Sequence, residues 1–398
     1  MQNKNSKLIT RFLTFTILLS FFFSCTQGQK MKNEIQTAAS QPDEYLPILV
    51  GKKVGLAVNH SSILYDTLHL VDFLLTKEVN VVKIFGPEHG FRGNAAYGEY
   101  VSDEKDLKTG IPIVSLYGKN RKVPAEQLKG LDIVIFDIQD VGARFFTYIS
   151  TMHYVMEACA ENGVRVIVLD RPNPNGYYVD GPVMQNEFKS FVGIHNIPIV
   201  HGMTVGELAN MINDEGWLTN GIKCDLTVIK MQNYDHNSRY SLPVAPSPNL
   251  PNDKSVNLYP SICLFEGTEI SLGRGTDFPF QVLGYPEPAF GDFKFTPVSL
   301  PGIAPHPPSV NKECFGIDLR QEKELNEISL KYLIEFYQKW DQDKPFFKDF
   351  INNLAGTAAL REQIKGGWTE EEIKASWQPG LEEFKKLRKK YLLYKDFE

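Results

Sequence analysis

Val79-Asn-Val-Val-Lys-Ile-Phe-Gly-Pro-Glu-His-Gly-Phe-Arg-Gly93 is the stretch from which the fold of this chain can be worked out. Its first seven residues are mostly apolar, and the Gly-Pro pair that follows ends a strand because proline lacks an amide donor. Glu88, His89 and Arg92 then place a carboxylate, an imidazole and a guanidinium within five positions. This order is typical of a buried strand that ends in a functional loop, although a tight turn with solvated charges has a similar composition.

The same strand character recurs along the chain. Apolar runs of strand length alternate with segments that have the apolar spacing of helices. Strands that are apolar on both faces and alternate with helices predict a parallel sheet covered on both sides. The predicted class is therefore α/β, with a Rossmann-like parallel-sheet domain followed by a smaller α+β C-terminal domain. The predicted strands are 53–59, 79–85, 111–116, 132–137, 165–170 and 224–230, and the predicted helices are 68–78, 147–161, 204–214, 324–339, one that starts at the capping box of Thr369, and 381–394.

Polar residues follow four of these strands at the point where each strand ends. In open parallel sheets, ligands bind outside the carboxyl ends of the strands, because the loops converge there. We therefore expect a shared site at this edge of the sheet. The candidates are Asn59 and His60 after the first strand, Glu88, His89 and Arg92 after the second, Asp137, Asp140 and Arg144 after the fourth, and Asp170, Arg171 and Asn173 after the fifth.

No cofactor and no metal are predicted for this site. The loop after the first strand lacks the G-x-G-x-x-G of a dinucleotide site, and the chain has no phosphate loop ending in Gly-Lys-Ser/Thr. Neither a G-x-S-x-G nucleophile elbow nor an H-E-x-x-H zinc helix occurs. Apart from Cys25, the cysteines are widely spaced among apolar residues, which favours buried free thiols over disulfides.

The N-terminus predicts export. Three basic residues precede an apolar run from Phe12 to Phe23, which is too short to span a bilayer and is typical of a signal peptide. Ser24-Cys25 at the end of this run resembles a bacterial lipobox. We therefore expect residues 1–25 to be a lipoprotein signal peptide, with Cys25 lipidated and the protein anchored to a membrane in the periplasm. An ordinary signal peptide cleaved nearby is the alternative.

Composition sets the domain organisation and the class of partner. Residues 26–45 are polar and are predicted to form a flexible tether. The formal net charge of −6 becomes −9 once the three basic residues of the signal peptide are removed, which disfavours nucleic acid or an anionic membrane surface as the main partner. The remaining length predicts two domains. A proline-rich stretch at 243–260 is either a domain boundary or a rigid loop that lines the site, and its asparagines favour some of both. We place the boundary there, between a Rossmann-like catalytic domain at 46–245 and a smaller α+β domain at 246–398 that closes the cleft.

A second group of functional residue types follows this boundary. Between Cys263 and Phe280, the charged residues Glu266, Arg274 and Asp277 lie among glycines, threonines and aromatic residues. This mixture suits the recognition of a polar ligand that has an apolar face. A glycine-rich loop with a local pair between arginine and aspartate is the simpler alternative.

Five motifs together carry a resemblance to a known family. They are Ile84-Phe-Gly-Pro-Glu-His-Gly-Phe-Arg-Gly93, Asp137-Ile-Gln-Asp-Val-Gly-Ala-Arg-Phe-Phe-Thr-Tyr148, Leu169-Asp-Arg-Pro-Asn-Pro-Asn-Gly176, Ser247-Pro-Asn-Leu-Pro251 and Glu266-Gly-Thr-Glu-Ile-Ser-Leu-Gly-Arg-Gly-Thr-Asp277. From about Gly51 to its C-terminus the sequence resembles the exo-β-N-acetylmuramidases, a bacterial glycoside hydrolase family. The resemblance implies a Rossmann-like domain, a smaller C-terminal domain and an active site in the cleft between them. It also implies release of N-acetylmuramic acid from the non-reducing end of peptidoglycan fragments, with disaccharides and muropeptides as substrates in cell-wall turnover or recycling.

The candidate residues suit this chemistry. Glycoside cleavage needs an acid to protonate the leaving oxygen, and a carboxylate or the substrate's acetamido group to act at the anomeric carbon. We expect Glu88 to be the general acid, with His89 tuning its charge. Asp137 or Asp140 would orient a water molecule or stabilise the acetamido group. The lactyl carboxylate of muramic acid matches a forked guanidinium, for which the candidates are Arg92, Arg144, Arg171 and Arg274.

Two other classes of function stay open on the residues alone. A lipid-anchored protein could bind muropeptides in the same cleft without cleaving them. A metal-dependent hydrolase acting on another bond of the cell wall is the third, since Asp, His and Glu can ligate a divalent ion.

Overall fold

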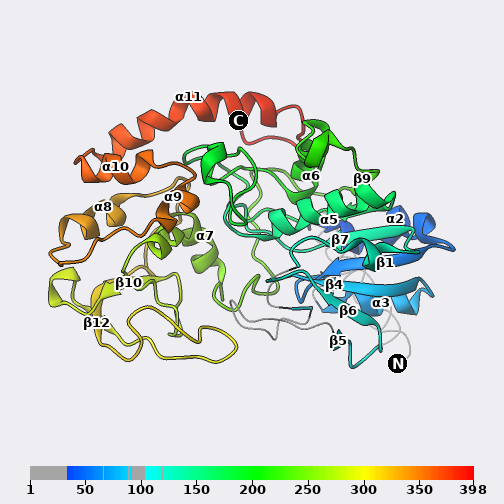
Figure 1. Ribbon diagram of the computed structural model, residues 1–398, viewed down its shortest axis with the longest axis horizontal. Helices are drawn as coiled ribbons and strands as arrows, with labels where there is room; N and C mark the ends of the chain where they lie inside the picture. Colours follow the sequence, from blue (N-terminus) through cyan, green and yellow to red (C-terminus); the bar gives the residue numbers. More distant parts are fainter. Residues whose placement is uncertain (1–33, 66, 88–89, 92–103, 119) are drawn as a thin grey trace, which may run out of the picture.

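A seven-stranded sheet forms the centre of the N-terminal half of the molecule (Figure 1). The computed structural model describes residues 34–398, apart from residues 66, 88–89, 92–103 and 119. Six strands run parallel, and the short edge strand β5 is antiparallel to its neighbour β6. The order across the sheet is β5-β6-β4-β1-β7-β8-β9. The bounds are β1 Lys53–Val58, β4 Asn80–Gly86, β5 Glu104–Lys105, β6 Pro112–Ser115, β7 Ile133–Asp137, β8 Arg165–Leu169 and β9 Leu226–Ile229.

This strand order confirms the predicted α/β class. β4 and β6 extend the sheet on one side of β1, whereas β7, β8 and β9 extend it on the other. The chain therefore winds outward from β1 in both directions, as in Rossmann-type sheets. Loops separate where the winding reverses, between β1 and β7, and open sheets of this kind bind ligands beside that point.

Alternate side chains of the central strands enter two different cores, one on each face of the sheet. In β7, Ile133 and Ile135 pack in a cluster with residues of α2 and α3, whereas Val134 and Phe136 pack in a cluster with residues of α5 and α6. The central strands are apolar on both faces in the sequence because helices cover both faces of the sheet. The bounds in this half are η1 Ala38–Ser40, α2 Pro42–Leu49, β2 Ile63–Leu64, β3 Leu68–His69, α3 Leu70–Thr76, α4 Ala125–Leu128, α5 Tyr148–Asn162, η2 Asn186–Phe188, α6 Val205–Asp214 and η3 Thr219–Gly221.

The fold begins earlier in the chain than predicted. Tyr45 of α2 is fully buried in the core beneath the sheet, and its hydroxyl donates to the carbonyl oxygen of Ala39 at 2.8 Å. Gln36 pairs with Gln232, just after β9, through two backbone hydrogen bonds of 3.0 Å. Residues 36–45 therefore belong to the fold and not to the predicted tether, because they cover apolar surface of the sheet. Cys25 lies outside the described residues.

A smaller α+β domain forms the C-terminal half, as predicted. Its antiparallel sheet has the order β10-β12-β11 and lies at the opposite end of the molecule from the parallel sheet (Figure 1). Phe136 of β7, Tyr259 of α7 and Phe336 of α8 belong to one hydrophobic cluster, so the two halves share a continuous core. The bounds are α7 Asp253–Ile262, η4 Cys263–Gly267, β10 Val282–Tyr285, η5 Pro288–Phe290, β11 Phe293–Phe295, β12 Cys314–Asp318, α8 Lys331–Gln338, α9 Phe350–Ala355, α10 Ala359–Lys365 and α11 Glu370–Arg388.

Two helices predicted in the C-terminal half differ from those observed. The predicted helix 324–339 begins only at Lys331, because the preceding amides bond to other elements: the amide of Ile328 donates to the carboxylate of Asp180 at 2.7 Å. The segment predicted as a separate helix at 381–394 is mostly the end of α11, which starts at the capping box of Thr369 and continues through Pro379. The capping boxes predicted for α6 and α11 are both present.

The last residues of the chain return to the first domain. The buried guanidinium of Arg388 donates twice to the carbonyl oxygen of Gly202, at 3.0 and 2.8 Å. The hydroxyl of Tyr394 donates to the carboxylate of Asp170 at 2.6 Å, and the amide of Leu393 donates to that of Glu207 at 2.8 Å. The C-terminal segment thus supplies partners to buried groups that follow β8 and begin α6.

The cysteines of both domains are unpaired. Cys159, Cys224, Cys263 and Cys314 are buried free thiols, which confirms the prediction from their spacing. Within the described part of the chain, no helix combines the length and the apolar character needed to cross a membrane.

Candidate active site

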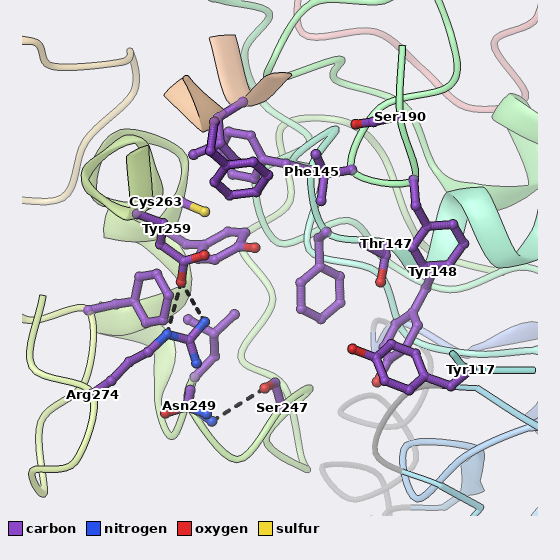
Figure 2. Close-up of a pocket in the computed structure, with 18 of the residues that line it drawn as sticks. Tyr117, Phe145, Thr147, Tyr148, Ser190, Ser247, Asn249, Tyr259, Cys263 and Arg274 are labelled. Atoms are coloured by element: carbon purple, nitrogen blue, oxygen red, sulfur yellow. Dashed lines mark hydrogen bonds and ion pairs between the residues drawn. The ribbon is translucent and has the colours of Figure 1, made fainter. Parts of the chain in front are cut away.

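A pocket of about 300 Å³ lies between the two domains (Figure 2). On one side it is lined by segments that follow parallel strands: Tyr117 comes just after β6, residues 145–147 lie between β7 and α5, and Tyr148 begins α5. On the other side, Tyr259, Cys263 and Arg274 come from the C-terminal half, as Figure 2 shows. The pocket is therefore at the carboxyl edge of the sheet, where the sequence pattern predicted a site.

Eight of the nineteen residues that line the pocket are aromatic. Tyr117, Phe145, Phe146, Tyr148 and Phe191 line it from the first domain, and Tyr259, Phe280 and Phe350 line it from the second. Phe145 and Phe146 both pack edge-on against Tyr259 across the domain boundary, with ring centroids 5.3 and 5.8 Å apart. Rings held in this way make a rigid apolar surface, and a few polar groups among them can fix the orientation of a ligand.

An ion pair between Glu266 and Arg274 lies in this wall. Nη2 and Nε of Arg274 both donate to Oε1 of Glu266, at 2.6 and 2.9 Å, and the guanidinium is 4.9 Å from the ring centre of Phe280. Gly275, directly after this arginine, must be glycine, because its φ is +81° and a Cβ there would lie 2.4 Å from the backbone oxygen of Val298. The local partner is thus glutamate, and Asp277, which was also a candidate, is exposed and does not line the pocket.

A second pocket adjoins the first. It has a volume of about 720 Å³ and is formed by the proline-rich segment 301–308 together with Lys348. Glu266, Arg274 and Phe350 line both pockets, so the ion pair separates two neighbouring spaces. A ligand with two parts could occupy both.

Asp137 and Arg171 pair with each other beside the point where the sheet winding reverses. Nε and Nη2 of Arg171 donate to the two carboxylate oxygens of Asp137, at 2.5 and 2.8 Å. The side chains of Asp137 and Arg171 are 0% and 3% exposed, and neither lines the pocket. The structure therefore gives these predicted site residues a role in holding the loops after β7 and β8 together.

Asp140 and Arg144 are also buried within the first domain. Burial raises the pKa of Asp140 to about 7, and its carboxylate accepts from the amide of Gly142 at 2.6 Å. Burial likewise lowers the pKa of His201, 3.9 Å from Asp140, to about 3, so neither group gains a charged partner from the other. The guanidinium of Arg144 donates to three carbonyl oxygens, those of Pro182, Ile197 and Leu354. Because Leu354 is in α9, Arg144 connects the two halves of the chain.

The other described candidates of the first domain, Asn59, His60, Asp170 and Asn173, bond to its loops and do not line the pocket. Asn59 accepts from the amide of Ser61 at 2.9 Å, and Nε2 of His60 lies 2.8 Å from the carbonyl oxygen of Ala245. Asn173 donates to the carbonyl oxygen of Met203 at 2.8 Å. The carboxylate of Asp170 accepts from Tyr394, from the hydroxyl of Thr204 at 2.8 Å and from the amide of Gly206 at 2.8 Å, while burial raises its pKa to about 7.

Glu88, His89 and Arg92 lie outside the described residues. The strand that precedes them ends at Gly86, which pairs with Ser115 at the end of β6. Among the residues that the structure describes, no group of three or more His, Cys, Asp or Glu side chains is arranged to hold a metal ion.

Several pocket residues were missed by the sequence reasoning. Phe145, Phe146 and Tyr148 stand inside a motif of which only the charged residues were considered as candidates. Arg121 and Phe191 stand in segments without any recognised pattern. Asn249 lies in the proline-rich stretch, and its buried Oδ1 has no hydrogen-bond partner in the described structure. The asparagines of that stretch were the available signal.

Comparison with known sequences places both halves of the chain in one family. The N-terminal domain of the exo-β-N-acetylmuramidase NamZ matches residues 54–254, and the C-terminal domain of NamZ matches residues 257–394. The chain belongs to the exo-β-N-acetylmuramidase family. The predicted family membership and the predicted enzyme class, a glycosidase, are thereby confirmed. The family's two domains meet within α7, so the aromatic pocket is lined by residues of both.

Individual exo-β-N-acetylmuramidase relatives agree with this result. The chain is 39% identical, over 98% of its length and the whole of the relative, to the peptidoglycan β-N-acetylmuramidase NamZ of Bacillus subtilis strain 168. Two crystal structures of DUF1343 family proteins from Bacteroides fragilis NCTC 9343 have a similar fold. One has a TM-score of 0.85 and 48% identity, covering 91% of this chain and 99% of that one. The other has a TM-score of 0.79 and 30% identity, covering 91% and 100%.

Proposed function

We propose that this protein is an exo-acting glycosidase that releases N-acetylmuramic acid from the non-reducing end of peptidoglycan fragments, and that the aromatic pocket between the domains binds this sugar. The observation that carries the proposal is the pocket itself. It combines aromatic faces with the Glu266–Arg274 ion pair at the junction of two domains that both match the exo-β-N-acetylmuramidase family. The Bacillus subtilis relative, a peptidoglycan β-N-acetylmuramidase, supports the same reaction.

The pocket can contribute to such a reaction in two ways. Apolar ring faces can pack against the C–H faces of a pyranose, while polar groups such as the unpartnered Oδ1 of Asn249 can accept from its hydroxyl or amide N–H groups. Glu266 is the carboxylate among the described pocket residues. A carboxylate so placed favours the positive charge that develops on the sugar ring as the glycosidic bond breaks.

The general acid remains the prediction from the sequence. Glu88 would protonate the leaving oxygen, with His89 beside it. Asp137 and Asp140 are no longer our candidates for contact with the substrate, because both are buried in hydrogen-bonded loops away from the pocket. They support the loop between β7 and α5, which carries Phe145 and Phe146.

A defined disaccharide tests the proposal. We expect purified protein incubated with N-acetylmuramyl-N-acetylglucosamine to give free N-acetylmuramic acid, identified by mass spectrometry of the products. A longer fragment with muramic acid only at internal positions should stay intact, since the proposed action is confined to the chain end. Tight binding without any product after prolonged incubation would replace the glycosidase proposal by that of a muropeptide-binding protein.

We also propose that the protein acts in cell-wall turnover or recycling from a lipid anchor at Cys25 in the periplasm. The lipobox-like Ser24-Cys25 supports this, and Gln36, which already pairs with Gln232, would leave only a short connection to the membrane. Metabolic labelling with a radioactive fatty acid should mark the wild-type protein and leave Cys25→Ser unlabelled. Equal labelling of both, or of neither, would refute the anchor.

A further inference from the structure

Arg121 differs from the three described arginines that the sequence suggested for substrate binding. Arg144 donates to carbonyl oxygens, Arg171 is paired with Asp137, and Arg274 is paired with Glu266. Arg121 lines the pocket and is exposed, and in the described part of the chain its guanidinium has no carboxylate partner. Its one contact there is with an aromatic ring, that of Phe191, whose centre is 4.5 Å from the guanidinium carbon.

The ring that supports Arg121 is itself fixed. Phe191 stacks on Tyr154 of α5, with ring centroids 6.3 Å apart and planes 11° apart. Its carbonyl oxygen accepts from the hydroxyl of Ser150 at 2.8 Å. A guanidinium over an aromatic ring keeps its N–H groups available at its edge, where they can bind a carboxylate with two parallel hydrogen bonds. Arg121 is thus held in place without its hydrogen-bonding capacity being used.

The charge of the pocket points to the ligand. The charged residues among its described lining are Arg121, Arg274 and Glu266. Arg274 and Glu266 carry opposite charges and Arg121 is positive, so the described lining has one net positive charge, in a chain whose formal net charge is −6. A single local positive charge in an acidic protein attracts a ligand with one negative charge. N-Acetylmuramic acid differs from N-acetylglucosamine by a lactyl ether that carries one carboxylate.

We propose that Arg121 binds the lactyl carboxylate of the muramyl unit and so selects muramyl over glucosaminyl substrates. The inference rests on the proposed function, because it takes the pocket as the muramic acid site. Phe191 acts as a positioning residue that holds the guanidinium. Two charge-assisted hydrogen bonds from the exposed edge of the guanidinium to the lactyl carboxylate stabilise the bound state.

Binding of N-acetylmuramic acid and of its neutral methyl ester tests the role of Arg121. The ester has nearly the same shape and lacks the charge, and isothermal titration calorimetry measures both dissociation constants. We expect the wild-type protein to prefer the acid by about 10- to 100-fold, the range for a charge-assisted hydrogen bond. Arg121→Met, which keeps apolar contact with Phe191, should bind both alike, and Arg121→Lys should keep part of the preference. Higher ionic strength should reduce the preference, because Arg121 is exposed.

Arg239→Met is the matched control. Arg239 lies over Tyr177, 3.2 Å from its ring centre, and lines a different pocket. Its removal should leave the preference unchanged. The proposal is overturned if the wild type binds acid and ester equally or binds neither, or if Arg121→Met keeps the preference. If wild type and Arg121→Met both release N-acetylmuramic acid and prefer the acid over the ester equally, only the role of Arg121 is refuted. If the wild type prefers the acid but hydrolyses no substrate, only the glycosidase proposal is refuted.

Discussion

Replacing Asp137 by asparagine should lower the stability of the folded protein and should have little direct effect on turnover. The variant removes the negative charge opposite Arg171, whose side chain is 3% exposed, while Asp137 itself is 0% exposed. Both carboxylate oxygens accept from the guanidinium, at 2.5 and 2.8 Å, so the loss leaves a buried cation without its counter-charge. Removal of one partner from a buried ion pair typically costs about 3 to 5 kcal/mol. We expect Asp137→Asn to lose this amount of unfolding free energy.

Urea denaturation at neutral pH measures the loss, and a double variant separates its cause. Asp137→Leu combined with Arg171→Met removes both charges and should recover much of the stability, since well-packed apolar residues often replace a buried pair without loss. Under conditions where each variant is folded, turnover of a muramyl substrate should stay within about tenfold of wild type. If Asp137→Asn were as stable as wild type and more than a hundredfold slower, the carboxylate would be part of the chemistry and our structural assignment would be incorrect.

Three further predictions concern the pocket and its supporting loop. Glu266→Gln and Glu88→Gln should each lower kcat by about a hundredfold or more with the thermal transition near wild type, and near-normal turnover in either would remove that residue from the mechanism. Burial raises the pKa of Asp140 to about 7, so the folded state binds this proton more tightly than the unfolded chain, and ionisation of Asp140 costs stability as pH rises. The free energy of unfolding of Asp140→Asn should therefore increase relative to wild type between about pH 4 and pH 7 and stay level above. A difference in urea denaturation that does not depend on pH would contradict this. Gly142→Ala should destabilise the protein by roughly 2 to 4 kcal/mol, because a Cβ there would lie 2.1 Å from Asn173. Gly130→Ala, at a similar φ of +76° and with nothing within 4 Å of the new Cβ, should cost only about 1 kcal/mol. Equal losses of stability in the two variants would show that backbone strain alone matters.

The sequence predicted the elements well because their signals are local. Alternating faces buried by helices give doubly apolar strands, and the capping boxes at Thr204 and Thr369 require only residues three positions apart. The predicted start of helix 324–339 was wrong because it depends on distant residues. The amides that would have started it bond to Asp180 and Ser261, far away in the chain, which no local pattern reveals.

The candidate site was predicted in its place, but of the described candidate residues only Glu266 and Arg274 line the pocket. Carboxylates and guanidiniums do gather where the parallel strands end, yet Asp137 finds its partner 34 positions away and Asp170 finds one 224 positions away. Charged groups paired in this way hold loops together and do not line the pocket, where aromatic rings lie instead. Sequence alone cannot separate the two uses, because a carboxylate that binds a sugar and one that binds an arginine have the same local surroundings. Arg121 stood out only after the partners of the other arginines were known.

The return of the C-terminal segment to the first domain has a consequence for biosynthesis. Asp170 is synthesised well before Tyr394, whose phenol donates to it from 224 positions later in the chain. The first domain cannot complete this buried hydrogen bond until residue 394 has been made, so we expect it to remain protease-sensitive up to that point. A chain shortened before residue 388 would lose Arg388 from Gly202 as well as Tyr394 from Asp170. Pulse-chase proteolysis of the 398-residue chain and the shortened chain should show protection of the first domain only in the former, so that folding of the first domain depends on residues 388–394.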